Sequence, residues 1–237
     1  AGGAGSLACV MHLDRLSALD SSFLHQEDEA AHMHLGGVLV CEGPPPPIGE
    51  LLEHVRRRLD LVPRYRQKLA TPPGGAGREY WVDDPDFNLT YHVRHTALPA
   101  PGGDEQLRRL AARVFGQTLD RTKPLWELFV VEGMTGDRFA LISKTHHALV
   151  DGVSGVDITS VLFDTQPDPV PVAPPDRPWI PRPVPSSTHL LGDALVERAT
   201  QPAEILRGLR AAVRRPQQAM GSLRKRRAYS PIVQPVA

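Results

Sequence analysis

The residues with the clearest chemical potential lie in one short segment, from Lys144 to Gly152. His146 and His147 are adjacent, Asp151 follows His147 by four positions, and Gly152 comes next. A histidine can accept a proton near neutral pH, and a nearby aspartate can hold local geometry or pair with an arginine. Glycine permits a tight turn or a close backbone approach. From the residues alone, His147 is either a proton acceptor or a structural histidine at the end of a strand.

The spacing of this histidine and aspartate is weak evidence by itself. His189 and Asp193 repeat the spacing, but they lack a preceding histidine and a following glycine, so we do not expect them to be catalytic. A metal site is also not expected at His146 and His147. Neighbouring side chains on a strand point to opposite faces, which makes joint chelation difficult.

The surrounding sequence must place this segment at the edge of a sheet. Apolar runs, helical periodicity and glycine-rich breaks predict strands that alternate with helices, which is typical of a layered α/β domain. The expected strands are 35–41, 80–82, 126–132 and 139–145; the expected helices are 48–59, 107–115 and 153–163; and the expected loops are 74–77 and 133–136. The histidines then lie where a strand ends and a helix begins, a junction at which α/β proteins commonly build sites.

Composition excludes several classes of protein. The 27 basic and 27 acidic residues cancel, so there is no global charge argument for nucleic-acid binding. The two cysteines, Cys9 and Cys41, are too few for a disulfide framework. No apolar run approaches the roughly 18 residues of a membrane span. We expect a cytoplasmic protein, with peripheral association at the inner membrane or at lipid droplets as a further possibility.

Proline marks a boundary in the chain. Nine of the 24 prolines fall between Pro167 and Pro185, which predicts an extended linker. The expected organisation is a leader or expression remnant at 1–10, a catalytic lobe at 11–165, a linker at 166–186 and a basic helical segment at 187–237. That last segment is either a solvated helical face or a contact surface for an anionic membrane or a partner domain.

Several motifs together resemble one family. The motif from His146 to Gly152 resembles the HHxxxDG motif of acyltransferases related to chloramphenicol acetyltransferase, carnitine acyltransferases and condensation domains. The flanking segments narrow the resemblance to the bacterial wax ester synthase/diacylglycerol acyltransferase family. These segments are Leu16 to Phe23, Trp81 to Phe87, His92 to Arg94, Leu98 to Gly102, Leu119 to Arg121 and Pro124 to Glu127.

The resemblance implies a chloramphenicol acetyltransferase-like lobe, with a mixed β-sheet and flanking helices. It also implies an O-acyltransferase that transfers the acyl group of long-chain acyl-CoA to diacylglycerol, to a fatty alcohol, or to both. His147 would be the general base, His146 a supporting residue, Asp151 a structural residue paired with an arginine, and Gly152 a turn residue. Acyl-CoA would be a co-substrate, and no cofactor or metal is expected.

The family resemblance further implies a C-terminal lobe with an Asn-Asp motif, and Asn88 is the only asparagine here. We therefore expect this chain to be the first lobe, with the second absent. Two alternatives remain. One is a condensation-type enzyme that takes acyl groups from a carrier protein, and the other is a non-catalytic lobe that binds lipid or a partner.

Overall fold

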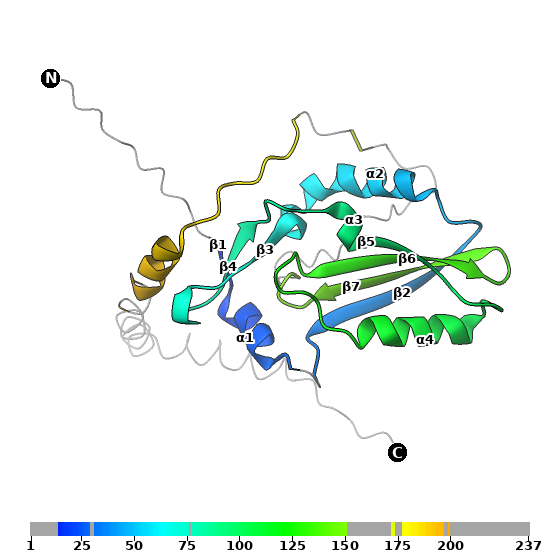
Figure 1. Cartoon of the computed structure of the whole chain (residues 1–237), viewed down its shortest axis with the longest axis horizontal. Coiled ribbons are helices and arrows are strands. Elements are labelled where there is room, and N and C mark those ends of the chain that lie inside the picture. The colour runs from blue at the N-terminus through cyan, green and yellow to red at the C-terminus, as the bar shows by residue number, and fades with distance from the viewer. Residues whose placement is uncertain are drawn as a thin grey trace, which may run out of the picture.

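A computed structural model describes residues 14–28, 31–75, 77–150, 172–173, 177–196 and 199. Within these residues, the main sheet has four strands in the order β2-β7-β6-β5 (Figure 1). The strands are β2 (His34–Glu42), β5 (Val93–Ala97), β6 (Trp126–Met134) and β7 (Arg138–His146). β5 runs parallel to β6 and the other pairs are antiparallel, so the expected mixed sheet is confirmed.

The pairing of β2 with β7 determines what lies beside the two histidines. The register places His34 opposite His146 and Gly36 opposite Lys144. β7 is reached from β6 through a tight turn with positive φ angles at Gly136 and Asp137, and Gly133, also at positive φ, lies at a register shift near the end of β6. This hairpin brings the end of β7 back toward the start of β2.

Helices cover both faces of the main sheet. α2 (Ile48–Arg58) and α4 (Asp104–Phe115) lie on opposite sides of it, as Figure 1 shows. Alternate residues of β7 therefore enter different cores: Leu141 packs in the cluster that includes Val55 of α2, while Ile142 packs in the cluster that includes Val114 of α4. Burial on both faces agrees with the lack of strict polar–apolar alternation in β6 and β7.

A smaller sheet with the order β1-β4-β3 lies beside the main one. Its strands are β1 (Asp14–Arg15), β3 (Gln67–Ala70) and β4 (Tyr80–Asp83). The remaining elements are α1 (Ala18–Gln26), α3 (Leu89–His92) and the short 3-10 turns Leu59–Leu61, Pro63–Arg66 and Pro73–Gly75. Ser17 begins α1 as an N-cap, because its hydroxyl accepts a hydrogen bond from the Asp20 amide at 3.1 Å.

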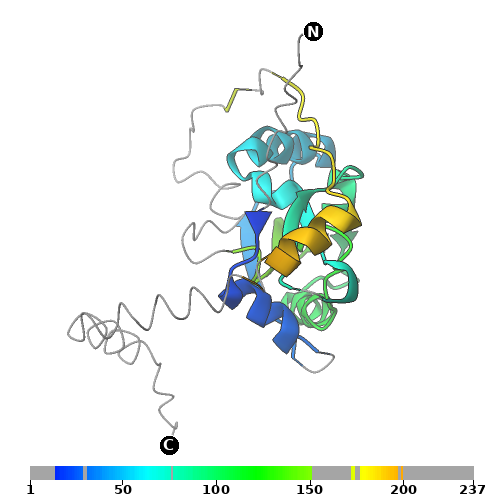
Figure 2. The same cartoon turned by 90° about the vertical axis from the view of Figure 1, so that its left-hand side faces the viewer.

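Most of the expected elements are present within the described residues. The helix expected at 153–163 lies outside the described residues. Part of the proline-rich segment packs on the lobe, because Arg182 binds the carboxylate of Asp83 with contacts of 2.9–3.1 Å. A helix at 187–196 follows, in which Leu190 is buried and Leu195 and Val196 are exposed. Figure 2 shows this helix lying across the lobe.

No helix in the described part of the chain is both long and apolar enough to cross a bilayer.

Candidate active site

His146 ends β7 and is fully buried. The backbone amide of Ala148 donates a hydrogen bond to its Nδ1 atom at 3.0 Å. Because Nδ1 is an acceptor, the neutral ring carries its proton on Nε2. Burial lowers the pKa of His146 well below its ordinary value, and the nearby Arg121 and His147 lower it further. The buried ring is therefore neutral at physiological pH and is not open to a substrate.

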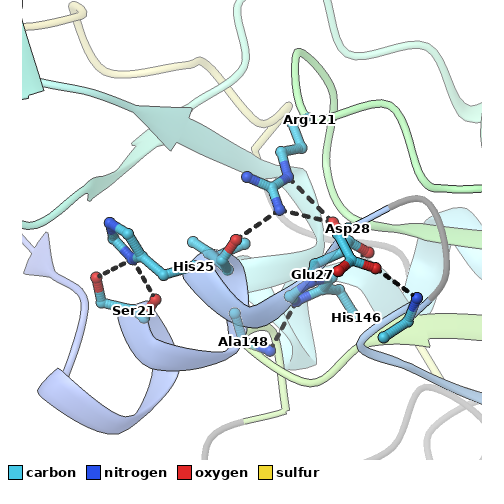
Figure 3. A network of polar contacts seen from close by, with 9 residues as sticks. Ser21, His25, Glu27, Asp28, Arg121, His146 and Ala148 are labelled. Carbon is cyan, nitrogen blue, oxygen red and sulfur yellow. Dashed lines mark hydrogen bonds and ion pairs between the residues drawn. The ribbon is translucent and has the colours of Figure 1, made fainter.

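Glu27 faces His146 from the end of α1 (Figure 3). The Oε1 atom of Glu27 lies 3.7 Å from Nε2 of His146. Its Oε2 atom accepts two hydrogen bonds from Arg121, from Nε at 3.1 Å and from Nη2 at 2.7 Å. Burial raises the pKa of Glu27, but the hydrogen bonds and the positive charge of Arg121 more than offset this, so the net pKa is lowered. The carboxylate is therefore ionised beside a neutral imidazole.

His147 is placed differently from its neighbour. Its side chain is half-buried, and its backbone amide donates to the Met33 carbonyl at 2.9 Å. Its ring stacks on Phe23 of α1, with centroids 5.0 Å apart and an interplanar angle of 26°. The strand ends at His146, so the backbone turns and presents His147 at the margin of the lobe. Of the two histidines, His147 is the more exposed to solvent.

A buried lysine connects this strand to α4. Lys144 is completely buried, and its Nζ atom donates to the carbonyls of Val114 and Gln117 at the carboxyl end of the helix. Unsatisfied carbonyls at a helix end favour a cation there. Burial lowers the pKa of Lys144, while Glu27 and Glu127 oppose this effect. Lys144 thus anchors α4 to β7 two residues before His146.

The other residues singled out by sequence have structural surroundings. Trp126 is fully buried, as expected for a core residue, and its indole N–H donates to the Tyr65 carbonyl at 2.8 Å. Asp193 binds Arg15 and Tyr80, which agrees with a structural role for this second histidine–aspartate pair. Asp151 and Gly152 lie outside the described residues. Within the part of the chain that the structure describes, no group of three or more His, Cys, Asp or Glu side chains could hold a metal ion.

Comparison with known protein families decides the family. The family model described as the wax ester synthase/diacylglycerol acyltransferase catalytic domain matches residues 16–236. The chain belongs to this family. The expected resemblance is therefore confirmed over nearly the whole chain, and not only around the HHxxxDG motif.

Two similar relatives in this family come from Mycobacterium tuberculosis. The probable diacylglycerol O-acyltransferase tgs3 of Mycobacterium tuberculosis is 42% identical over 201 residues, which cover 84% of this chain and 73% of that protein. The probable diacylglycerol O-acyltransferase tgs1 of the same species is 39% identical over 154 residues, which cover 64% of this chain and 33% of that protein. The chain thus matches most of one family member and a third of another.

Solved structures agree on the fold. The wax ester synthase/diacylglycerol acyltransferase from Marinobacter aquaeolei VT8 has 33% identity and a TM-score of 0.51, over 59% of this chain and 36% of that one. The starter condensation domain of rhizomide synthetase RzmA has 16% identity and a TM-score of 0.50, over 63% of this chain and 37% of that one. The second likeness concerns the fold alone.

Sequence reasoning missed the residues that hold the two histidines in this wax ester synthase/diacylglycerol acyltransferase lobe. Phe23, Glu27, Met33 and Arg121 all contact them or each other, but none was expected at the site. Phe23 and Arg121 lie inside segments that carry the family resemblance. That was the available signal, yet the separation of 94 residues between Glu27 and Arg121 gave no reason to pair them.

Proposed function

We propose that the chain is the histidine-bearing part of an acyl-CoA-dependent O-acyltransferase. It would make triacylglycerol from diacylglycerol, wax esters from long-chain alcohols, or both. The observation that carries this proposal is the contrast between the two histidines. His147 is half-buried and stacks on Phe23, whereas His146 is fully buried, accepts a hydrogen bond from Ala148 and faces Glu27.

In the proposed reaction, His147 acts as a general base on the acceptor alcohol. It takes the hydroxyl proton, and the alkoxide oxygen attacks the thioester carbonyl of acyl-CoA. The tetrahedral intermediate then collapses, breaks the carbon–sulfur bond and expels the thiolate. The protonated His147 returns its proton to the sulfur, so the residue is regenerated and no covalent acyl-enzyme forms.

The other motif residues have supporting roles in this proposal. His146 would hold the turn that carries His147, Asp151 would orient the motif through an arginine, and Gly152 would permit the turn. A second, C-terminal lobe is proposed as the partner that completes the substrate site. No metal or cofactor takes part in the proposed step, and acyl-CoA is a co-substrate.

The test is an esterification assay with long-chain acyl-CoA and either diacylglycerol or a fatty alcohol. It uses the chain alone and the chain fused to the C-terminal part of a longer relative. In the active form, His147→Ala should lower turnover by about 10²–10⁴-fold, the range typical of a lost general base. Equal turnover in His147→Ala and the parent protein would refute the mechanism. Transfer from an acylated carrier protein but not from acyl-CoA would refute the proposal that acyl-CoA is the acyl donor.

A further inference from the structure

One side of α1 contacts both histidines of the motif. Phe23 and Glu27 are four residues apart, so they lie on the same face at the end of the helix. Phe23 stacks on the ring of His147, and Glu27 faces the ring of His146. The two adjacent histidines therefore both contact side chains of α1 and its C-cap residue.

Arg121 fixes the Glu27 carboxylate from the side away from His146. It donates to Oε2 of Glu27 and to the Leu24 carbonyl at 2.7 Å, so it ties the carboxylate to the last turn of α1. The main chain of His147 is held separately, because its amide donates to the Met33 carbonyl at 2.9 Å.

Two buried polar atoms meet at the centre of this arrangement. Among the described residues, neither Oε1 of Glu27 nor Nε2 of His146 has a hydrogen-bond partner, and the two atoms lie 3.7 Å apart. Buried polar atoms almost always have a hydrogen-bond partner, so two such atoms that face each other without a hydrogen bond need an explanation. A movement of well under 1 Å would complete the bond, and hydrogen bonds at active sites are commonly long until substrate binds.

Stability alone does not account for a charged pair at this place. The side chain of Glu27 is 5% exposed, and burying a carboxylate costs free energy that its partner arginine often only just offsets. An apolar pair would support α1 equally well. What an apolar pair could not provide is an acceptor that faces the Nε2 proton of His146.

We propose that Glu27, held by Arg121, is a positioning residue for acyl transfer, because it faces His146 and lies at the end of the helix whose Phe23 stacks on the adjacent His147. The inference rests on the proposed role of His147 as the base. Glu27 does not touch the substrate in this account. It acts only through the orientation of the two histidines.

The first experiment uses whichever form of the protein, the chain alone or the fusion, has esterification activity. In that form, Glu27→Gln is compared with a matched control. Glu27→Gln should lower kcat by about 10- to 100-fold, the cost of a small misplacement of a reacting group, with KM changed less than about 2-fold. Asp83→Asn is the control, since Asp83 is also a buried carboxylate paired with an arginine but lies in the smaller sheet. It should lower the melting temperature and leave kcat unchanged. Wild-type kcat in Glu27→Gln would overturn the proposal.

A second arm separates positioning from general weakening of the fold. In the His147→Ala background, Glu27→Gln should cause no further loss of turnover, because a residue that acts only through His147 has nothing left to position. An equal fold-loss in both backgrounds would overturn the proposal. Arg121→Lys, which keeps the charge, should retain more kcat than Arg121→Met.

A third measurement does not depend on activity. Nitrogen-detected NMR of the histidine rings should show His146 as the Nε2–H tautomer, and the His147 ring protons should carry the ring-current shift of stacked Phe23. Glu27→Gln should alter both sets of signals. Unchanged His147 signals would overturn the positioning role. Altered signals in a protein that does not esterify would refute the proposed function and leave the coupling intact.

Discussion

Phe23 stacks face to face on His147, with ring centroids 5.0 Å apart. The contact joins α1 to the turn after β7 and covers one side of the imidazole. A flat hydrophobic ring restricts rotation of its neighbour and excludes water from that side. The half-exposed His147 therefore keeps a defined orientation although it lies at the margin of the lobe.

Phe23→Leu should accordingly lower kcat several-fold while the chain remains folded. Leucine retains most of the apolar contact but not the flat face that orients the imidazole. Leu19→Ala, one turn earlier on α1 at a side chain 62% exposed, is the control and should leave kcat unchanged. Steady-state kinetics with saturating acyl-CoA would measure both effects. A wild-type kcat in Phe23→Leu would show that the stack has no orienting role.

Gly36 of β2 should not tolerate a larger residue. A Cβ atom at this position would lie 2.7 Å from Cδ1 of Phe115, the last residue of α4. Gly36→Ala should thus destabilise the protein by about 1–3 kcal/mol, as overpacking usually does.

Gly49 provides a control in which the free energy of unfolding should change in the opposite direction, because a Cβ atom there would meet nothing within 4 Å. Gly49 lies in α2, so Gly49→Ala should stabilise the protein by up to about 1 kcal/mol. Urea unfolding of both variants measures the two changes. A Gly36→Ala protein as stable as the parent would show that Phe115 moves aside at little cost.

His92 should make the protein sensitive to mild acid. It is stacked between Phe87 and Trp126, and its Nδ1 atom donates to the Trp126 carbonyl at 2.8 Å. Burial lowers the pKa of His92 from 6.5 to about 4. As pH falls from 6.5 toward 4, the unfolded chain takes up a proton before the folded chain does, so the free energy of unfolding decreases. The loss should reach up to about 3 kcal/mol at pH 4.

The comparison that isolates this effect is His92→Phe, which keeps a flat ring and cannot titrate. Between pH 6.5 and 4, the free energy of unfolding of this variant should depend less steeply on pH than that of the parent protein. The difference in slope should correspond to about one fewer proton taken up on unfolding. The absolute stability of the variant is not the readout, because the hydrogen bond to Trp126 is also lost. Identical slopes for the two proteins would mean that His92 is charged in the folded state.

The ion pair between Asp83 and Arg182 should fasten the proline-rich segment to the lobe above about pH 4. Burial raises the pKa of Asp83, but the hydrogen bonds from Arg182 and Gln67 outweigh it and lower the pKa from 3.8 to about 2. The pair is fully formed above the unfolded pKa, and its contribution is lost as pH falls from 3.8 to 2. Because the Arg182 side chain is 66% exposed, solvent screening limits this contribution to about 1–2 kcal/mol.

Asp83→Asn and Arg182→Gln should therefore both lower the free energy of unfolding at pH 7, and the deficit should shrink toward pH 2. Limited proteolysis within 177–186 should also be faster in both variants at neutral pH. Cleavage at the parental rate would show that the segment is held by other contacts, such as that between Trp179 and Phe87.

Local pattern in the sequence determined three of the four strands of the main sheet, β2, β6 and β7, and the two helices that pack on it. The apolar runs before His146 and after Trp126 predicted β7 and β6, and helical periodicity predicted α2 and α4, because these segments are buried in a way that their own residue order reveals. The HHxxxDG motif and its flanking segments identified the family and the two histidines. β5 and α1 gave little signal: β5 has only five residues, and α1 carries a mixture of small and polar side chains.

Only the tertiary structure decided how the two histidines differ. In the sequence they are neighbours with the same side chain, and nothing in their spacing states which one is buried. The register of β2 against β7, the end of the strand at His146 and the approach of α1 bury one ring against Glu27 and leave the other half-exposed on Phe23. Glu27 and Arg121 are 94 positions apart, and such a contact depends on how distant segments pack, which residue periodicity does not encode.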